Sequence, residues 1–209
     1  MSARRPLALA ATGLALALAL AACGSSTNMS GMDMSSGSGS SAQAATGRDA
    51  DIAFAQLMIP HHQQALEMAE LALAQTTDPN ITQLAEDIKA AQDPEIAQMK
   101  AWLSAWGAPE QMDGATASDG SMDHSGMDMG GMTSSGMMSD EDMQTLMAAK
   151  GADFDRMWLQ MMIAHHQGAI SMANQVLSTT SDAEVKQLAE AVVAGQTAEI
   201  ATMQKLLAG

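Results

Sequence analysis

The chain has 209 residues and a formal net charge of −15, from 24 Asp and Glu against nine Lys and Arg. So acidic a chain is a poor partner for nucleic acid, because phosphate binding needs a basic surface. Aromatic residues make up only 2% of the chain, which disfavours an aromatic-rich β-sandwich or barrel. The single cysteine excludes a disulfide framework and a cysteine-based zinc site.

Residues 1–22 have the pattern of a signal peptide. Arg4 and Arg5 precede an apolar Ala/Leu run over 7–22, which is too short to span a bilayer comfortably. The run ends in Leu20-Ala21-Ala22-Cys23, which resembles the bacterial lipobox, where the cysteine is lipidated and becomes the new N-terminus. We therefore expect an exported lipoprotein, anchored through Cys23 to the outer face of the cell membrane. The alternative is an ordinary signal peptide with a chance cysteine.

Two segments have the composition of flexible linkers. Residues 23–47 and 107–139 are rich in Ser, Gly and Met and show no apolar periodicity. We expect the first to be a disordered tether behind the lipid anchor. The second is predicted to be a long, disordered, Met-rich loop. Connections of this length without structure are uncommon in compact domains and are usually functional or linkers.

The segments on either side of the Met-rich loop are copies of each other. Residues 51–105 align with 155–209 at a constant offset of 104 without a gap, and 24 of the 55 aligned positions are identical. Chance does not give this agreement, so the sequence contains an internal duplication.

Each copy has the pattern of a helix pair. Apolar residues recur at three- and four-residue spacing over 54–72 and again over 81–103, and Asp78-Pro79 between them suits the start of a helix. In the second copy, Ser139 and Ser181 are predicted to open capping boxes, and Gly151 to break an extra turn or two from the third helix. The sequence therefore predicts an all-α four-helix bundle over residues 48–209, with two halves related by a pseudo-twofold axis.

Both copies carry the same run of potential metal ligands. On a helix, Met58, His61 and Met68 share one face, and their counterparts in the second copy do the same. Packing about a twofold axis is expected to bring His61 and His165 together with thioethers nearby. Imidazole plus thioether is a soft ligand set that suits Cu(I) and tolerates Cu(II). The ligands predicted in this way are Met58, His61, His62, Met68, Met162, His165, His166 and Met172.

The loop offers a second group of soft ligands. The spacing of the methionines in the loop allows two or three sulfur atoms to bind one ion. Packing does not explain these methionines, because the loop has no apolar core. Sequence drift and a sacrificial sink for oxidants are the alternatives. The predicted ligands in this segment are Met122, His124, Met127 and Met129.

Packing alone is the competing interpretation inside the helices. Methionine at helical spacing is often core filler, and a buried histidine is often only a hydrogen-bonded core residue. Core packing is the interpretation favoured for Met99, Met143, Met147, Met157 and Met203. Here, however, a His-His pair occurs twice at the same register among only five histidines. Glu95 and Glu199 either hydrogen-bond the imidazoles or are surface charges.

The doubled block His-His-Gln-x-Ala-x-x-Met-Ala, followed by Gln-x-x-Glu-Ile-x-x-Met, resembles the DUF305 family of exported bacterial proteins over most of residues 50–209. The resemblance implies a ferritin-like four-helix bundle and, in some relatives, periplasmic copper binding and copper tolerance. The second copy departs from the family pattern by ending in Lys205-Leu206-Leu207, where the first has Trp102-Leu103. The motif residues that the resemblance carries over are His61, His62, Met68, His165, His166 and Met172.

The function expected from the sequence is a membrane-anchored lipoprotein that binds copper, with Cu(I) favoured, for sequestration or tolerance, and that catalyses no reaction. A metal-free structural or interaction lipoprotein is one alternative, and homo-oligomers are possible. A di-metal oxidase is another, but that class needs Glu-x-x-His motifs, and positions 58 and 162, three residues before His61 and His165, are methionine.

Overall fold

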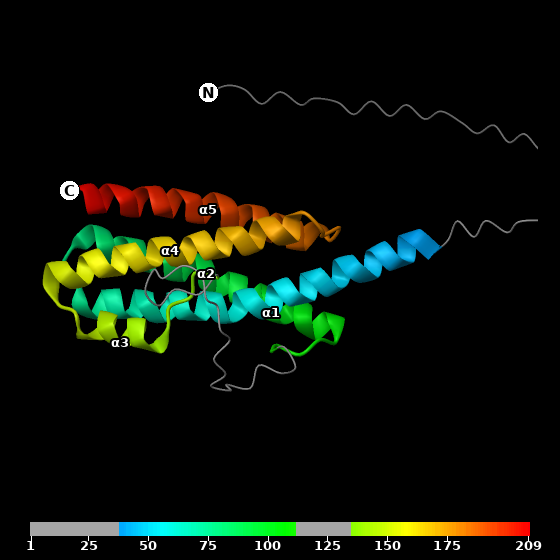
Figure 1. The fold of residues 1–209 in the computed structure, drawn as a ribbon, viewed down its shortest axis with the longest axis horizontal. Coiled ribbons are helices and arrows are strands. Elements are labelled where there is room, and N and C mark those ends of the chain that lie inside the picture. The colour runs from blue at the N-terminus through cyan, green and yellow to red at the C-terminus, as the bar shows by residue number, and fades with distance from the viewer. Residues whose placement is uncertain (1–37, 112–134) are drawn as a thin grey trace, which may run out of the picture. The chain divides into compact units, whose positions relative to one another are not determined.

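The structure, a computed structural model, describes residues 38–111 and 135–209, with side chains described from residue 47. The helices within these ranges are α1 (Ser38–Gln75), α2 (Pro79–Trp106), α3 (Asp140–Ala148), α4 (Gly151–Leu177) and α5 (Ala183–Ala208) (Figure 1). Among them, none combines the length and the apolar composition that crossing a bilayer requires.

The four long helices form the predicted bundle. α1 packs on α2 and α4 packs on α5, so each sequence repeat is one helix hairpin (Figure 1). The two hairpins meet chiefly along α1 and α4, while α2 also touches α5 and the short α3 packs on α4. The fold class expected from the periodicity is therefore confirmed.

The helix ends follow from local capping chemistry. The Asp78 carboxylate accepts hydrogen bonds from the first backbone N–H groups of α2, and Pro79 occupies its first turn. Gly107 ends α2 with a φ of 67°, in the left-handed region that favours glycine. Ser139 and Asp142 form the predicted capping box of α3. Gly151 has a φ of 57° and separates α3 from α4, as expected.

Three predicted boundaries were wrong. The disordered loop predicted over 107–139 was wrong at its end, where Met138 is buried and its backbone is hydrogen-bonded to Gln64. α1 begins at Ser38, so residues 38–47 are helical and do not belong to a disordered tether that ends at 47. Ala42, Ala44 and Ala45 are good helix formers, and extending an existing helix needs no new nucleus. The N-cap of α5 is Asp182 and not Ser181, because the Asp182 carboxylate accepts the backbone N–H groups of Glu184 and Val185.

The apolar core is divided into two clusters by a polar layer. The buried apolar residues between 54 and 59 of α1 belong to the same cluster as those between 169 and 176 of α4. Those between 65 and 72 of α1 belong to the same cluster as those between 154 and 162 of α4. The two helices are therefore antiparallel and cross between the clusters. The His-His pairs of both repeats lie at that crossing, at positions 61–62 and 165–166. The pseudo-twofold relation between the halves thus places four histidines in one buried layer.

Candidate metal centre

His61 and His165 meet at the crossing of α1 and α4. Their ring centroids are 3.7 Å apart, with an angle of 37° between the ring planes. Both side chains are excluded from water, at 0% and 1% exposure. The neighbour one helical turn further along each helix is an alanine, Ala65 or Ala169, whose small side chain leaves room beside each ring. The contact predicted from the duplication is confirmed.

His62 and His166 form a second symmetric pair, each held by a carboxylate of its own repeat. The Nε2 atom of His62 lies 2.8 Å from Oε2 of Glu95 on α2, and Nε2 of His166 lies 2.6 Å from Oε2 of Glu199 on α5. An ionised carboxylate only accepts hydrogen bonds, so each imidazole donates its Nε2–H. That arrangement fixes ring orientation and, in the neutral imidazole, leaves the lone pair on Nδ1.

A short segment, Ser135–Met138, covers the histidine layer; we call it the strap. The Nε2–H of His61 donates to the backbone carbonyl of Ser135 at 3.0 Å, because a carbonyl oxygen only accepts. The side-chain amide of Gln64 holds the other end of the strap by two hydrogen bonds, accepting from the backbone N–H of Met138 at 2.7 Å and donating to its carbonyl at 2.8 Å.

The strap can pass over α4 only because Gly168 has no side chain. A Cβ atom at Gly168 would lie 1.7 Å from the carbonyl oxygen of Ser135, and one at Gly136 would lie 2.5 Å from the carbonyl oxygen of Ala164. Gly136 also has a φ of 76°, which residues with a side chain rarely adopt. Two glycines therefore allow backbone to lie directly on backbone at this point.

Burial keeps the central histidines neutral. Burial first, and then the nearby charge of His62, lower the pKa of His61 to about 3. Burial also lowers the pKa of His165 well below its usual value, with the charge of His61 as the next cause. At neutral pH both imidazoles therefore carry a lone pair that no proton occupies.

Several ring nitrogens in this layer have lone pairs to offer. Within the described part of the chain, Nδ1 of all four histidines is buried and makes no hydrogen bond, and neither does Nε2 of His165. Buried polar atoms are normally paired, so a cluster of unpaired ones needs an explanation. Neutral imidazole nitrogen is a common metal ligand, so the donor set fits a bound metal ion. Across residues 38–111 and 135–209, no group of three or more His, Cys, Asp and Glu side chains is arranged to hold a metal ion by itself.

The predicted methionine ligands lie one or two helical turns from this layer along the helices. Met58 and Met162 are fully buried one turn before the histidines, Met68 is fully buried further along α1, and Met172 is half-buried on α4. All four belong to or pack against the two core clusters, so packing also accounts for their burial. The remaining predicted site residues lie outside the described residues: Cys23, Met122, His124, Met127 and Met129.

Other residues of the site were missed by sequence reasoning. Ser135 and Gly168 belong to the strap contact, and Gln64 holds it in place. The aligned repeats contained a signal for the last two, since Gln64 and Gly168 occupy equivalent positions yet differ in the middle of a shared block. Gln92 and Gln196 are also buried in equivalent positions, one turn before Glu95 and Glu199.

Comparison with known proteins agrees with this architecture. The model of the DUF305 family, a domain of unknown function, matches residues 51–207. A DUF305 fragment from Deinococcus radiodurans has a TM-score of 0.63 and 32% identity, covering 76% of this chain and 95% of that one. A DUF305 protein from Streptomyces coelicolor, described as secreted, has a TM-score of 0.63 and 34% identity, covering 76% and 91%.

A third similar structure contains metal. CopM in its Cu(I)-bound form has a TM-score of 0.58 and 30% identity, covering 75% of this chain and 94% of that one. CopM has also been solved in Cu(II)-bound, silver-bound and apo forms. No curated protein shows a significant match to the chain.

Proposed function

The chain belongs to the DUF305 family, and from that premise we propose that it is an exported protein that binds copper in its buried histidine layer, sequesters the ion and catalyses no reaction. The observation that carries the proposal is the contact between His61 and His165, two buried, neutral imidazoles with unpaired ring nitrogens. The copper-bound structures of CopM, at 30% identity, support copper as the ion.

The hydrogen bonds suggest which atoms take part. His61 donates Nε2–H to Ser135, so its Nδ1 carries the lone pair available to a metal. His165 has no hydrogen bond on either ring nitrogen within the described residues, so either atom can act. Thioethers of Met58 and Met162, one turn away, are the nearest soft ligands along these helices and would favour Cu(I) over harder ions.

The glutamates in the layer are better suited to positioning than to catalysis. Glu95 and Glu199 each accept a hydrogen bond from a histidine, which orients His62 and His166. A di-metal oxidase of the ferritin-like type needs such carboxylates free to ligate two ions. This arrangement supports binding over oxidation chemistry.

Export and anchoring complete the proposal. The signal-peptide pattern of residues 1–22 and the Streptomyces coelicolor relative, which is described as secreted, both support a location outside the cytoplasm. Cys23 would anchor the chain to the membrane, and the methionines between 122 and 132 would capture Cu(I) before it reaches the buried layer.

The test is an anaerobic competition for Cu(I) between the chain lacking residues 1–22 and a chromophoric chelator. The His61→Ala/His165→Ala variant should lose the tight site, with an affinity at least tenfold weaker, and keep weak binding by the methionines. Gln63→Ala, on the exposed side of the same turn, is the matched control and should bind like the parent. If the double variant titrates like the parent, the histidine layer is not the copper site.

A second measurement separates copper binding from a metal-free structural role. A ligand that binds only the folded chain must raise its stability. Thermal unfolding of the parent with and without Cu(I) should therefore show a higher Tm with copper. An unchanged Tm would favour the structural role, and the double variant, checked as folded by circular dichroism, should show little increase.

A further inference from the structure

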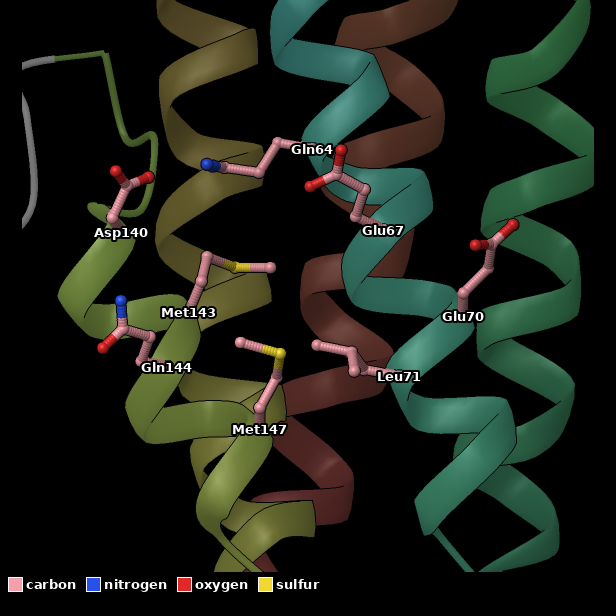
Figure 2. Close-up of a pocket in the computed structure, with 8 residues that line it drawn as sticks. All are labelled: Gln64, Glu67, Glu70, Leu71, Asp140, Met143, Gln144 and Met147. Carbon is pink, nitrogen blue, oxygen red and sulfur yellow. The ribbon is translucent and has the colours of Figure 1, made fainter.

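A second group of soft ligands lies at the surface, in a pocket between α1 and α3. The pocket has a volume of about 480 Å³ and is separate from the rings of the histidine layer. Figure 2 shows the thioethers of Met143 and Met147 on the side of α3 that faces Leu71 of α1. The sequence alone suggested that these two methionines are core filler.

Packing does not explain both thioethers. α3 is held to the core by Leu146, which is fully buried. Met143 is half-buried against the core, but Met147 leaves 46% of its surface exposed. An exposed thioether beside an open pocket gains little from the hydrophobic effect. The two residues are one turn apart on the same face, and their three flexible side-chain bonds let both sulfurs approach one point.

The charged residues that line the pocket are all carboxylates, which favours a cation. Lys150 donates to the backbone carbonyl of Met147 at 3.2 Å but does not line the pocket. Glu67 and Asp140 line the pocket, are exposed, and form no ion pair with any residue that the structure describes. A third carboxylate, Glu70, is paired with Lys89 at 2.6 Å. Two unpaired carboxylates raise the local concentration of cations, and thioether sulfur selects soft ions among them.

We propose that this pocket is a second, solvent-facing site for a soft monovalent cation, Cu(I) or Ag(I), bound by the sulfurs of Met143 and Met147 with a carboxylate of Glu67 or Asp140 balancing its charge. Thioethers are neutral, so two sulfurs leave the positive charge of the ion unbalanced, and a carboxylate supplies the compensating negative charge. Hard divalent ions are disfavoured, because two of the three donors are sulfur.

The pocket is linked to the histidine layer through one side chain. Gln64 lines the pocket and also holds Met138 of the strap, whose other end accepts the hydrogen bond from His61. An ion held here would therefore lie beside the segment that covers the buried site. The proposed surface site does not require that the buried layer bind metal, because the two sites have no ligand in common.

The test is a titration of the full chain with silver nitrate in chloride-free buffer, because Ag(I) has the ligand preferences of Cu(I) without its redox chemistry. The chain carries ¹³C-labelled methionine methyl groups, and the signals of Met143 and Met147 are assigned from the variants Met143→Leu and Met147→Leu. Leucine for methionine conserves volume, so folding should be retained. Both methyl signals should shift together, with the same dependence on Ag(I).

In Met143→Leu, the Ag(I) concentration that half-saturates the Met147 signal should rise at least tenfold. Met157→Leu, a half-buried methionine on α4, is the control and should leave that concentration unchanged. The proposal is overturned if the two signals stay fixed while other methionines respond, or if Met147 titrates identically without Met143. A parallel Ag(I) titration of the chain with ¹⁵N-labelled histidine reports on His61 and His165 in the buried layer, so failure of either site is distinguishable.

Discussion

Gln64 and Gly168 occupy the same position in the two repeats, and both contact the strap. Gln64 forms hydrogen bonds to the backbone of Met138 through both the oxygen and the nitrogen of its side-chain amide. Gly168 has no side chain, so the backbone of Ser135 can lie directly on α4. A glutamine at both positions would block the strap, and a glycine at both would leave it unheld. The duplicated bundle is thus asymmetric at the position where the chain crosses its histidine layer.

Replacing Gly168 by alanine should destabilise the protein. The new Cβ would lie 1.7 Å from the Ser135 carbonyl oxygen, which is backbone and cannot move aside cheaply. Overpacking of this kind costs about 1–3 kcal/mol. Gly195→Ala on α5 is the control, because nothing lies within 4 Å of its added Cβ, and it should stabilise by roughly 0.5–1 kcal/mol. Urea unfolding of both variants measures the difference, and equal stability of the two would contradict this account.

Removing the Gln64 side chain should loosen the strap without unfolding the bundle. Gln64→Ala deletes both hydrogen bonds to Met138. Each is worth about 0.5–1.5 kcal/mol, so hydrogen exchange of the Met138 amide should accelerate roughly tenfold or more. Gln63→Ala, which changes the exposed neighbour, should leave that rate unchanged. A Met138 amide that exchanges equally fast in parent and variant would show that Gln64 does not hold the strap.

Truncating Glu199 should leave His166 with an unpaired donor in the core. His166 is fully buried and its Nε2–H donates to Glu199 at 2.6 Å. An unsatisfied buried donor costs about 1–3 kcal/mol, so Glu199→Ala should lower the free energy of unfolding by that amount. Glu190→Ala, on the same helix but in an exposed pair with Lys186, should change it by no more than about 0.5 kcal/mol. Similar losses in both variants would argue that the His166 pair is an ordinary surface contact.

The central histidines should make the fold less stable in mild acid. The pKa of His61 is about 3 in the folded chain, against about 6.5 when unfolded, so the unfolded chain binds more protons between these values. The contribution of His61 to the free energy of unfolding is therefore fully present above pH 6.5. It decreases as the pH drops toward 3, by up to about 1.4 kcal/mol per pH unit for each such histidine. His165, whose pKa is also lowered, acts in the same direction.

Urea unfolding at pH 7 and pH 5 measures this dependence. The His61→Gln/His165→Gln variant supplies the comparison, since glutamine does not titrate while carboxylates elsewhere contribute equally to both proteins. The parent should lose more stability than the variant on going to pH 5. Equal losses would mean that the two imidazoles are accessible to protons in the folded state.

The sequence predicted the bundle and the central contact because both follow from helical periodicity and duplication. Register alone placed His61 and His165 inward, and twofold packing of two equal halves brought them together. Of the two interpretations left open for Glu95 and Glu199, hydrogen bonding to imidazoles is confirmed. Register did not reveal that their partners are the outer histidines, His62 and His166.

The strap could not be predicted in the same way. Residues 135–138 have no apolar periodicity, so their path depends on tertiary contacts that no local pattern encodes. The surface pocket was missed for a related reason. Met143 and Met147 have the spacing of core residues, and only the packing of α3 through Leu146 shows that Met147 is left exposed.

The most direct measurement of the central claim is the ¹⁵N spectrum of the histidine side chains during titration of the full chain with Ag(I). If His61 and His165 share one ion, Nδ1 of His61 and one ring nitrogen of His165 should shift together and reach saturation at the same Ag(I) concentration. Nε2 of His62 and His166 should stay hydrogen-bonded to Glu95 and Glu199. If methionine methyl signals saturate while the ring nitrogens of His61 and His165 remain unchanged, the buried layer is not a metal site.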